Sequence, residues 1–280
     1  MQIDGSWHLW FGNEKVTLIA FIDDATSSIL LGEFVDREST KNLGELTQKY
    51  VKQYGRPVAL YSDRGSTYKV NNGKNSRAEK THYQRMLQEL DIELIHARSP
   101  QAKGRVERLF ETLQDRLIKE LELEGITTLE AANAYLRNVY IPEHNERYAV
   151  QPLEKADFHR AIDGYNLSSI FCRKFERIIK NDYTIQFKDS WFQLEQSSEI
   201  FIRRGQRVTI YEHFDGTIDI MRGGTRLAFK RITKQSNKLK QQHKQRAEER
   251  VRKLVYHKPS IFHPWRSSGD CSDISKELKR

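Results

Sequence analysis

Cysteine is scarce in this chain of 280 residues, which contains only Cys172 and Cys271. The two are far apart in the sequence, and no Cys-x-x-Cys pair exists. A structural zinc site usually combines several cysteines or histidines at short spacing, so the sequence excludes one of that kind. A framework of disulfides is not indicated either, which predicts a reducing compartment.

Long apolar runs are also missing. No segment approaches the roughly 18 to 20 apolar residues that a membrane-spanning helix needs. The first residues, Met1–Gly5, lack the basic start and the apolar stretch of a signal peptide. We therefore expect a cytoplasmic protein that does not act at a membrane.

Charge, by contrast, is abundant and unbalanced. Lysine and arginine number 47 against 38 acidic residues, which gives a formal net charge of +9. Hydrophobic residues make up 38% of the chain, enough for a packed core under a charged surface. A basic balance indicates a polyanionic partner, most often nucleic acid, although a merely solvated basic surface is the alternative.

The first part of the chain, residues 1–165, alternates between strand and helix patterns. β-branched and apolar runs, bounded by turn residues, predict strands at 1–5, 15–23, 28–35, 57–62 and 91–96. Apolar residues at helical spacing predict helices at 39–55, 79–90, 104–124 and 128–144. This order predicts a mixed α/β domain with a five-stranded sheet and helices on both faces.

The remainder of the chain differs in character. Short alternating segments separated by turn residues predict a small all-β barrel domain over 168–232. Residues 233–280 form a basic tail that we expect to be partly disordered or helical. From 230 to 258, eleven residues are lysine or arginine and two are acidic, which predicts an arm that binds a phosphate backbone.

Three acidic residues occupy informative places in the predicted core. Asp4 lies in the first strand, Asp63 at the carboxyl end of the fourth strand, and Glu107 in the first turn of the long helix, just off its apolar stripe. Carboxylates brought together repel one another, and hard divalent cations remove that penalty. Two Mg²⁺ or Mn²⁺ ions held by such a set can clamp the attacking and leaving oxygens of a phosphoryl displacement.

The motifs around these acids resemble the catalytic core of DDE transposases and retroviral-type integrases, which has a ribonuclease H-like fold. The closest resemblance is to bacterial insertion-sequence transposases of the ISNCY group. Four runs over about residues 1–160 carry it: Gln-Ile-Asp-Gly-Ser at 2–6, Phe-Ile-Asp-Asp-Ala-Thr at 21–26, Tyr-Ser-Asp-Arg-Gly at 61–65, and Ser-Pro-Gln-Ala-Lys-Gly-Arg-Val-Glu-Arg at 99–108. The stretch 145–152 also resembles the usual close of such cores. By this resemblance Asp4, Asp63 and Glu107 are the catalytic acids and the metal ligands.

The resemblance implies metal-dependent DNA cleavage and strand transfer, with transposon ends and target DNA as partners and a homo-oligomer on DNA. Two departures from the family pattern stand out. The 43 residues between Asp63 and Glu107 exceed the family spacing of about 35, and the first strand begins at Met1, where the family usually has a preceding helix-turn-helix region. Two alternatives therefore stay open: a non-catalytic DNA-binding or regulatory transposase fragment, and a nuclease of the ribonuclease H type.

Basic and polar residues near these features are candidate DNA contacts. They lie before and within the long helix, in the β domain and in the tail: Gln101, Lys103, Arg105, Arg108, Arg203, Arg204, Lys238, Lys240, Lys244 and Arg246. For Arg108 the alternative is a surface pair with Glu111. We expect Asp23 and Asp24 to form a hairpin turn and His96 to be structural.

Overall fold

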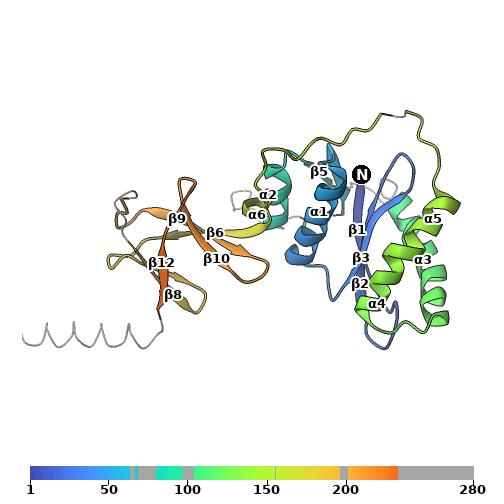
Figure 1. Ribbon diagram of the computed structural model, residues 1–280, viewed down its shortest axis with the longest axis horizontal. Helices are drawn as coiled ribbons and strands as arrows, with labels where there is room; N and C mark the ends of the chain where they lie inside the picture. The colour runs from blue at the N-terminus through green and yellow to red at the C-terminus, as the bar shows by residue number, and fades with distance from the viewer. Residues whose placement is uncertain (64–66, 69–79, 97–103, 155, 196–200, 233–280) are drawn as a thin grey trace, which may run out of the picture. The chain divides into compact units, whose positions relative to one another are not determined.

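The structure is a computed structural model that describes residues 1–63, 67–68, 80–96, 104–154, 156–195 and 201–232 (Figure 1). Contacts divide the chain into two compact units, which are described separately below. The first is Met1–Glu176 with Val208–Arg226, and the second is Arg177–Arg207 with Leu227–Arg280. The basic tail predicted at 233–280 lies outside the described residues, and the three domain boundaries drawn from the sequence stay predictions.

A five-stranded mixed sheet lies at the centre of the first unit. Its strands are β1 (Gln2–His8), β2 (Val16–Ile22), β3 (Ile29–Val35), β4 (Ala59–Ser62) and β5 (Glu93–His96), in the spatial order β3-β2-β1-β4-β5. β1, β2 and β3 pair antiparallel, whereas β4 is parallel to both β1 and β5. The mixed α/β class and the five-stranded sheet predicted from the sequence are thus confirmed.

Helices cover both faces of this sheet (Figure 1). On one face, α1 (Thr40–Tyr54) and α2 (His82–Glu89) share an apolar cluster with β1, β2 and β4. On the other, α3 (Gly104–Leu123), α4 (Leu129–Tyr135), the π-helix η2 (Leu136–Tyr140) and α5 (Ile141–Tyr148) share a second cluster with β2 and β3. None of the helices in the described part of the chain is long and apolar enough to cross a membrane.

The helix predicted at 128–144 is interrupted by the π-helical segment η2. Pro142, in the first turn of α5, has no N–H, and its ring crowds the carbonyl four residues earlier. A local widening to π-helical geometry, in which Ile141 donates to the carbonyl of Leu136, lets the chain continue as helix. The helix predicted at 128–144 is thus present, and the π-helical segment within it is a feature that the prediction did not include.

Helix α1 begins and ends where the sequence predicts. The Ser39 side chain accepts a hydrogen bond from the amide of Asn42, and Gly55 ends the helix with a φ of 90°. A Cβ at position 55 would lie 2.8 Å from the carbonyl oxygen of Arg160, which pairs with Arg56 in an isolated bridge. Glycine is therefore required here both for the backbone angle and for the close approach.

Two asparagine side chains complete the outer edge of the sheet at β3. Asn133 accepts from the amide of Phe34 at 2.7 Å and donates to its carbonyl at 2.9 Å. Asn145 makes the same pair of contacts with Ile29, at 2.8 and 2.9 Å. Each side-chain amide thus takes the place of a neighbouring strand, which satisfies backbone groups that an edge strand otherwise leaves unpaired.

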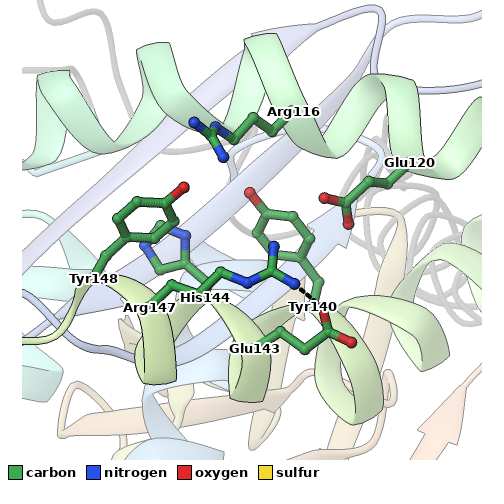
Figure 2. Close-up of a pocket in the computed structure, with 7 residues that line it drawn as sticks. All are labelled: Arg116, Glu120, Tyr140, Glu143, His144, Arg147 and Tyr148. Atoms are coloured by element: carbon green, nitrogen blue, oxygen red, sulfur yellow. Dashed lines mark hydrogen bonds and ion pairs between the residues drawn. The ribbon is translucent and has the colours of Figure 1, made fainter.

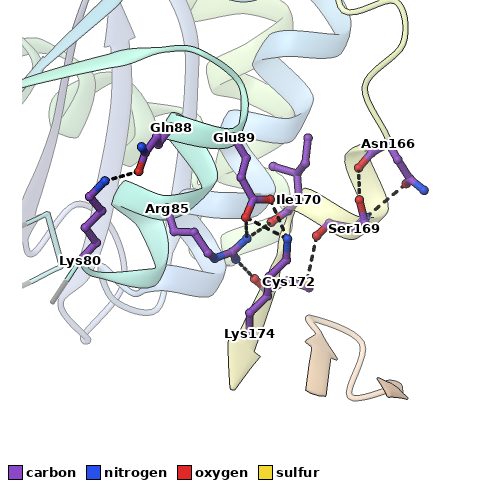
Figure 3. A network of polar contacts seen from close by, with 9 residues as sticks. All are labelled: Lys80, Arg85, Gln88, Glu89, Asn166, Ser169, Ile170, Cys172 and Lys174. Atoms are coloured by element: carbon purple, nitrogen blue, oxygen red, sulfur yellow. Dashed lines mark hydrogen bonds and ion pairs between the residues drawn. The ribbon is translucent and has the colours of Figure 1, made fainter. Parts of the chain in front are cut away.

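A polar network attaches the segment after α6 (Leu167–Ile170) to helix α2 (Figure 3). Arg85 donates to the carbonyls of Ile170 and Cys172 and pairs with Glu89, which also accepts from Lys174 at 2.7 Å. The Arg85 and Lys174 side chains are less than one-fifth exposed, so this ion-pair network is shielded from solvent on its basic side.

The rest of the chain forms antiparallel strands, as predicted. One sheet has the order β11-β10-β9-β6 and the other β12-β8-β7. The strands are β6 (Cys172–Ile178), β7 (Thr184–Phe187), β8 (Ser190–Leu194), β9 (Arg207–His213), β10 (Ile218–Arg222), β11 (Thr225–Arg226) and β12 (Phe229–Ile232). Phe201 and Ile202 lie outside these strands. Closure into a barrel stays a prediction.

Candidate active site

Asp4 and Asp63 lie on neighbouring parallel strands. Gln2 of β1 is the register partner of Tyr61 in β4, and the Tyr61 amide donates to the carbonyl of Met1 at 2.9 Å. Asp4 lies two residues after Gln2, and Asp63 lies two residues after Tyr61. The two carboxylates are therefore carried by opposed positions of the two strands. Because strands alternate their side chains, both lie on the face of Gln2 and Tyr61. Neighbouring strands lie about 4.8 Å apart, which places these two acids close together.

Helix α3 packs along β1 on that same face. The Gln114 side chain donates to Ser6 Oγ at 3.1 Å. At the start of the helix, Arg105 Nε lies 3.7 Å from Asp24 Oδ1, the same oxygen that accepts from Gln2 Nε2 at 2.7 Å. Asp4 lies between Gln2 and Ser6 on β1, and Glu107 lies between Arg105 and Gln114 on α3. The helix therefore runs beside β1 with Glu107 at about the level of Asp4.

The rotation of α3 about its axis gives Glu107 the flank nearer β1 and β4. Glu107 and Gln114 are seven residues apart, which is close to two turns at 3.6 residues per turn, so they share one flank. The buried stripe runs beside them and contains Val106, Leu109, Phe110, Leu113, Leu117 and Leu121. This stripe confirms the sequence prediction, and Glu107 is exposed at its edge.

The structure does not bring the three acids into one metal-binding cluster. Within the described ranges, no group of three or more His, Cys, Asp or Glu side chains lies close enough to hold an ion. Asp4 and Asp63 are opposed, and Glu107 is near their level but exposed. The donor set nevertheless suits a hard divalent cation, because carboxylate oxygens are the ligands that Mg²⁺ and Mn²⁺ prefer.

His96 holds the backbone at Asp63, a role that the sequence did not reveal. His96 Nδ1 lies 3.1 Å from the carbonyl oxygen of Asp63, so the tautomer with hydrogen on Nδ1 donates to it. Its Nε2 then accepts from the amide of Gln84, 3.3 Å away on α2. The imidazole therefore links the ends of β4 and β5 to α2, and it fixes the position of the Asp63 backbone. The expectation that His96 is structural agrees with these contacts.

Asp23 and Asp24 form the hairpin turn that the sequence predicted. Asp23 accepts hydrogen bonds from the amide and the hydroxyl of Thr26, at 3.0 and 2.7 Å, and Ser27 adopts a φ of 61°. Asp24 accepts from Gln2 and lies near Arg105, so this turn also anchors the start of α3.

The predicted DNA contacts fall in three groups. Arg108 donates through Nε to the carbonyl of Gly104 at 3.0 Å, and the alternative ion pair with Glu111 does not form in the described structure. In the second unit, Arg203 lies over the ring of Phe201 and Arg204 over that of Tyr183, at 5.3 and 5.9 Å, and both arginines are exposed. Gln101, Lys103, Lys238, Lys240, Lys244 and Arg246 lie outside the described residues.

Comparison with known proteins identifies transposases as relatives of this chain. It is 36% identical over 236 residues to y4bF of Sinorhizobium fredii, a protein named as a transposase, covering 82% of this chain and 51% of the relative. It is 34% identical over 223 residues to the transposase for insertion sequence IS1202 of Streptococcus pneumoniae, covering 78% and 47%. The chain thus spans about half the length of these curated relatives. No family model matches the sequence.

The solved structures that this chain matches include a viral intasome and an integrase catalytic core domain. A simian T-cell lymphotropic virus intasome in complex with the PP2A regulatory subunit B56 gamma matches with a TM-score of 0.41 and 14% identity, covering 81% of this chain and 76% of that one. The integrase catalytic core domain of HTLV-2 in complex with magnesium matches with a TM-score of 0.37 and 16% identity, covering 49% and 83%. These TM-scores are below 0.5, so the matches do not by themselves establish a shared fold.

Proposed function

We propose that this chain is the catalytic part of a DDE transposase with a ribonuclease H-like fold, which cleaves DNA strands and transfers a 3′-hydroxyl end into target DNA. The observation that carries the proposal is the placement of Asp4 and Asp63 at opposed positions of parallel strands, beside the helix that bears Glu107. The similarity to transposases over about four-fifths of the chain supports the same reaction class.

Asp4, Asp63 and Glu107 would hold two Mg²⁺ or Mn²⁺ ions. When bound, such ions supply charge stabilisation for the attacking and leaving oxygens of a phosphodiester. The chain's own residues position the acids: the backbone at Asp63 is held by His96, and α3 is docked on β1 through Gln114 and Ser6. Because Glu107 is exposed in the first turn of α3, its carboxylate can turn toward the sheet without disturbing the buried stripe.

DNA is the proposed partner, bound as transposon ends and as target, with a homo-oligomer forming on it. The excess of basic residues supports a polyanionic partner. The exposed Arg203 and Arg204 of the second unit and the basic tail supply further cationic groups for backbone phosphates.

Strand transfer in vitro tests the proposal. The assay contains the full chain, a labelled donor oligonucleotide, supercoiled plasmid, and Mg²⁺ or Mn²⁺. We expect joined products that require the metal and are lost in Glu107→Gln, because an amide is a poor ligand for a hard cation. Glu122→Gln, an equally conservative change at an exposed position of the same helix, should leave them intact.

Each other outcome contradicts a specific part of the proposal. Metal-dependent cleavage without joining would favour a nuclease of the ribonuclease H type. No reaction with either metal, together with salt-sensitive DNA binding, would favour the regulatory fragment. Equal activity in Glu107→Gln and wild type would exclude Glu107 from the metal site.

A further inference from the structure

A cleft separates α3 from α5 on the flank of α3 opposite Glu107. Its volume is about 340 Å³, and its polar lining comes from Ser27, Arg105, Arg108, Thr112, His144 and Tyr148. Figure 2 shows the adjoining part, where His144 and Tyr148 of α5 lie beneath Arg116 of α3 and the Tyr148 hydroxyl is directed toward that helix. We call this space, together with Arg116, the α3–α5 cleft.

His144, which lines the α3–α5 cleft, has a polar atom without a partner. Its residue is only 6% exposed, and its Nδ1 is buried without a hydrogen-bond partner in the described structure. Its ring is packed between Tyr140 and Tyr148, with centroids 5.8 and 4.8 Å away. A buried polar atom without a partner is costly, about 1–3 kcal/mol, so a group that supplied one beside the cleft would stabilise this site.

The charges around the cleft favour an anion. Among the described residues, neither Arg108 nor Arg116 forms an ion pair, and the Arg116 guanidinium lies 5.4 Å from the Tyr148 ring.

The nearby acids are engaged by other groups. Glu143 pairs with Arg147 at 3.0 Å, Glu120 accepts from Tyr135 at 3.1 Å, and Asp24 faces Arg105. Arg108 and Arg116 therefore remain at the cleft without an ion-pair partner among the described residues.

We propose that the α3–α5 cleft binds a phosphate group, supplied by the backbone of DNA. Arg108 offers charge-assisted donors, since guanidinium groups match phosphate oxygens in a fork geometry, and Arg116, about two turns further along α3, adds positive charge nearby. The hydroxyls of Ser27 and Tyr148 are further donors, and Nδ1 of the neutral His144 supplies one more in the tautomer that carries hydrogen there. A phosphate would thereby offer a partner to His144, whose Nδ1 is one of the buried side-chain atoms without a hydrogen bond among the described residues.

This assignment deepens the proposed function and rests on DNA being the partner. It adds a second DNA contact surface to α3, across the helix from Glu107. The sheet would contact α3 on one flank, and a backbone phosphate would contact it on the other. These two contacts would keep the helix from rotating relative to the DNA. The site therefore contributes to positioning rather than to the reaction itself.

The test uses the full chain and a duplex oligonucleotide, with affinity measured over a series of salt concentrations. Arg108→Gln is the main variant, because Arg108 is exposed and its loss should not disturb the core. Lys41→Gln, an exposed residue of α1 on the opposite face of the sheet, is the matched control for the lost charge. We expect Arg108→Gln to bind about three- to tenfold more weakly, and its slope of log affinity against log salt to be reduced by about 0.9 relative to the control.

A second measurement follows the imidazole of His144 directly. Inorganic phosphate added to the ¹⁵N-histidine-labelled protein should shift the His144 ring resonances in the wild type and shift them less in Arg108→Gln.

Three results would overturn the assignment. They are a salt slope for Arg108→Gln equal to that of Lys41→Gln, no response of His144 to phosphate, or a response to phosphate with unchanged DNA affinity, which would mark a small-anion site. If the wild type itself binds no DNA, the proposed function fails instead, so the two failures are distinguishable.

Discussion

The two faces of the five-stranded sheet are built on different principles. Beneath α1 and α2 the packing is almost wholly apolar and aromatic, with Tyr50, Tyr68 and Tyr83 fully buried. Hydroxyl groups also pair within this packing, as where the Thr47 hydroxyl lies 2.9 Å from that of Tyr83.

The α3 face is apolar only over β2 and β3. Over β1 it carries polar side chains at every second position, including Asp4, and beside β1 it carries Asp63 at the end of β4. Both faces carry an apolar cluster, whereas the groups that could do chemistry are concentrated on the second. Substitutions on the two faces should therefore separate activity from stability.

The largest expected effect is on activity, from Asp4→Asn. Replacing a metal-binding carboxylate by an amide removes a charged ligand, and we expect metal-dependent cleavage to fall by at least about a hundredfold, the scale on which loss of one electrostatic stabiliser acts. The thermal midpoint should change little, because Asp4 lies outside both apolar clusters.

Asp24→Asn is the matched control for Asp4→Asn. It lies on the same side of the sheet and keeps an oxygen that can accept from Gln2. Cleavage is then measured for both variants. Similar losses of activity would mean that these acids act only through the negative charge of this face, and the assignment of Asp4 as a metal ligand would fail.

On the opposite face, Leu87→Ala should lower stability and leave the activity of the folded protein nearly unchanged. Leu87 is fully buried between α2 and the sheet, and removing its side chain leaves a cavity that costs about 2–5 kcal/mol of unfolding free energy. Urea denaturation measures the loss, and cleavage per folded molecule, assayed well below the unfolding midpoint, should be near that of the wild type. A loss of activity in fully folded protein would show that the two faces are coupled.

Lowering the pH should reduce the free energy of unfolding through His144, which lies on the α3 face of the sheet. Burial, with the nearby Arg116 adding to it, lowers the pKa of this imidazole to about 4 from an ordinary value of 6.5. The unfolded chain therefore gains a proton as the pH falls below 6.5 while the folded chain does not, so stability is complete above pH 6.5 and is lost toward pH 4. The loss amounts to about 3 kcal/mol at 1.36 kcal/mol per pKa unit.

His144→Gln isolates this contribution from the other titrating groups. Its unfolding free energy should change less between pH 7 and pH 4.5 than that of the wild type, when both are measured by urea denaturation. An identical pH dependence in the two proteins would show that His144 is protonated equally in the folded and unfolded states.

The sequence predicted the elements well and their mutual placement poorly, for physical reasons. Strand and helix patterns depend on local periodicity, so Ser39 and Gly55 could be recognised as the ends of α1. The register that opposes Asp4 to Asp63 depends on long-range pairing, which no local pattern encodes.

Side-chain roles were hidden from the sequence for the same reason. His96 was expected only to be structural, and its contact with the Asp63 carbonyl arises because β4 and β5 pair in parallel. The unpartnered atom of His144 results from burial by two helices that meet only in the folded chain. The π-helical segment before Pro142 is the exception, since the proline itself was a readable signal.

The smallest predicted effect concerns the sheet edge, at Asn145. In the sequence, Asn145 belongs to a stretch that resembles the end of the family core. In the structure, its side chain pairs with the backbone of Ile29 as a neighbouring strand would. Asn145→Ala leaves the amide and carbonyl of Ile29 without these partners, at a cost of about 1–3 kcal/mol if water cannot replace them. Hydrogen exchange should show faster exchange of the Ile29 amide, with the amides of β1 unchanged.

Asn133→Ala is the matched variant, because Asn133 makes the same pair of contacts with Phe34 but is more deeply buried. Its cost should be at the upper end of the same range, since water cannot easily reach Phe34. If both variants instead leave stability and exchange unchanged, the edge of β3 needs no side-chain partner. The α4–α5 segment would then owe its position to apolar packing alone.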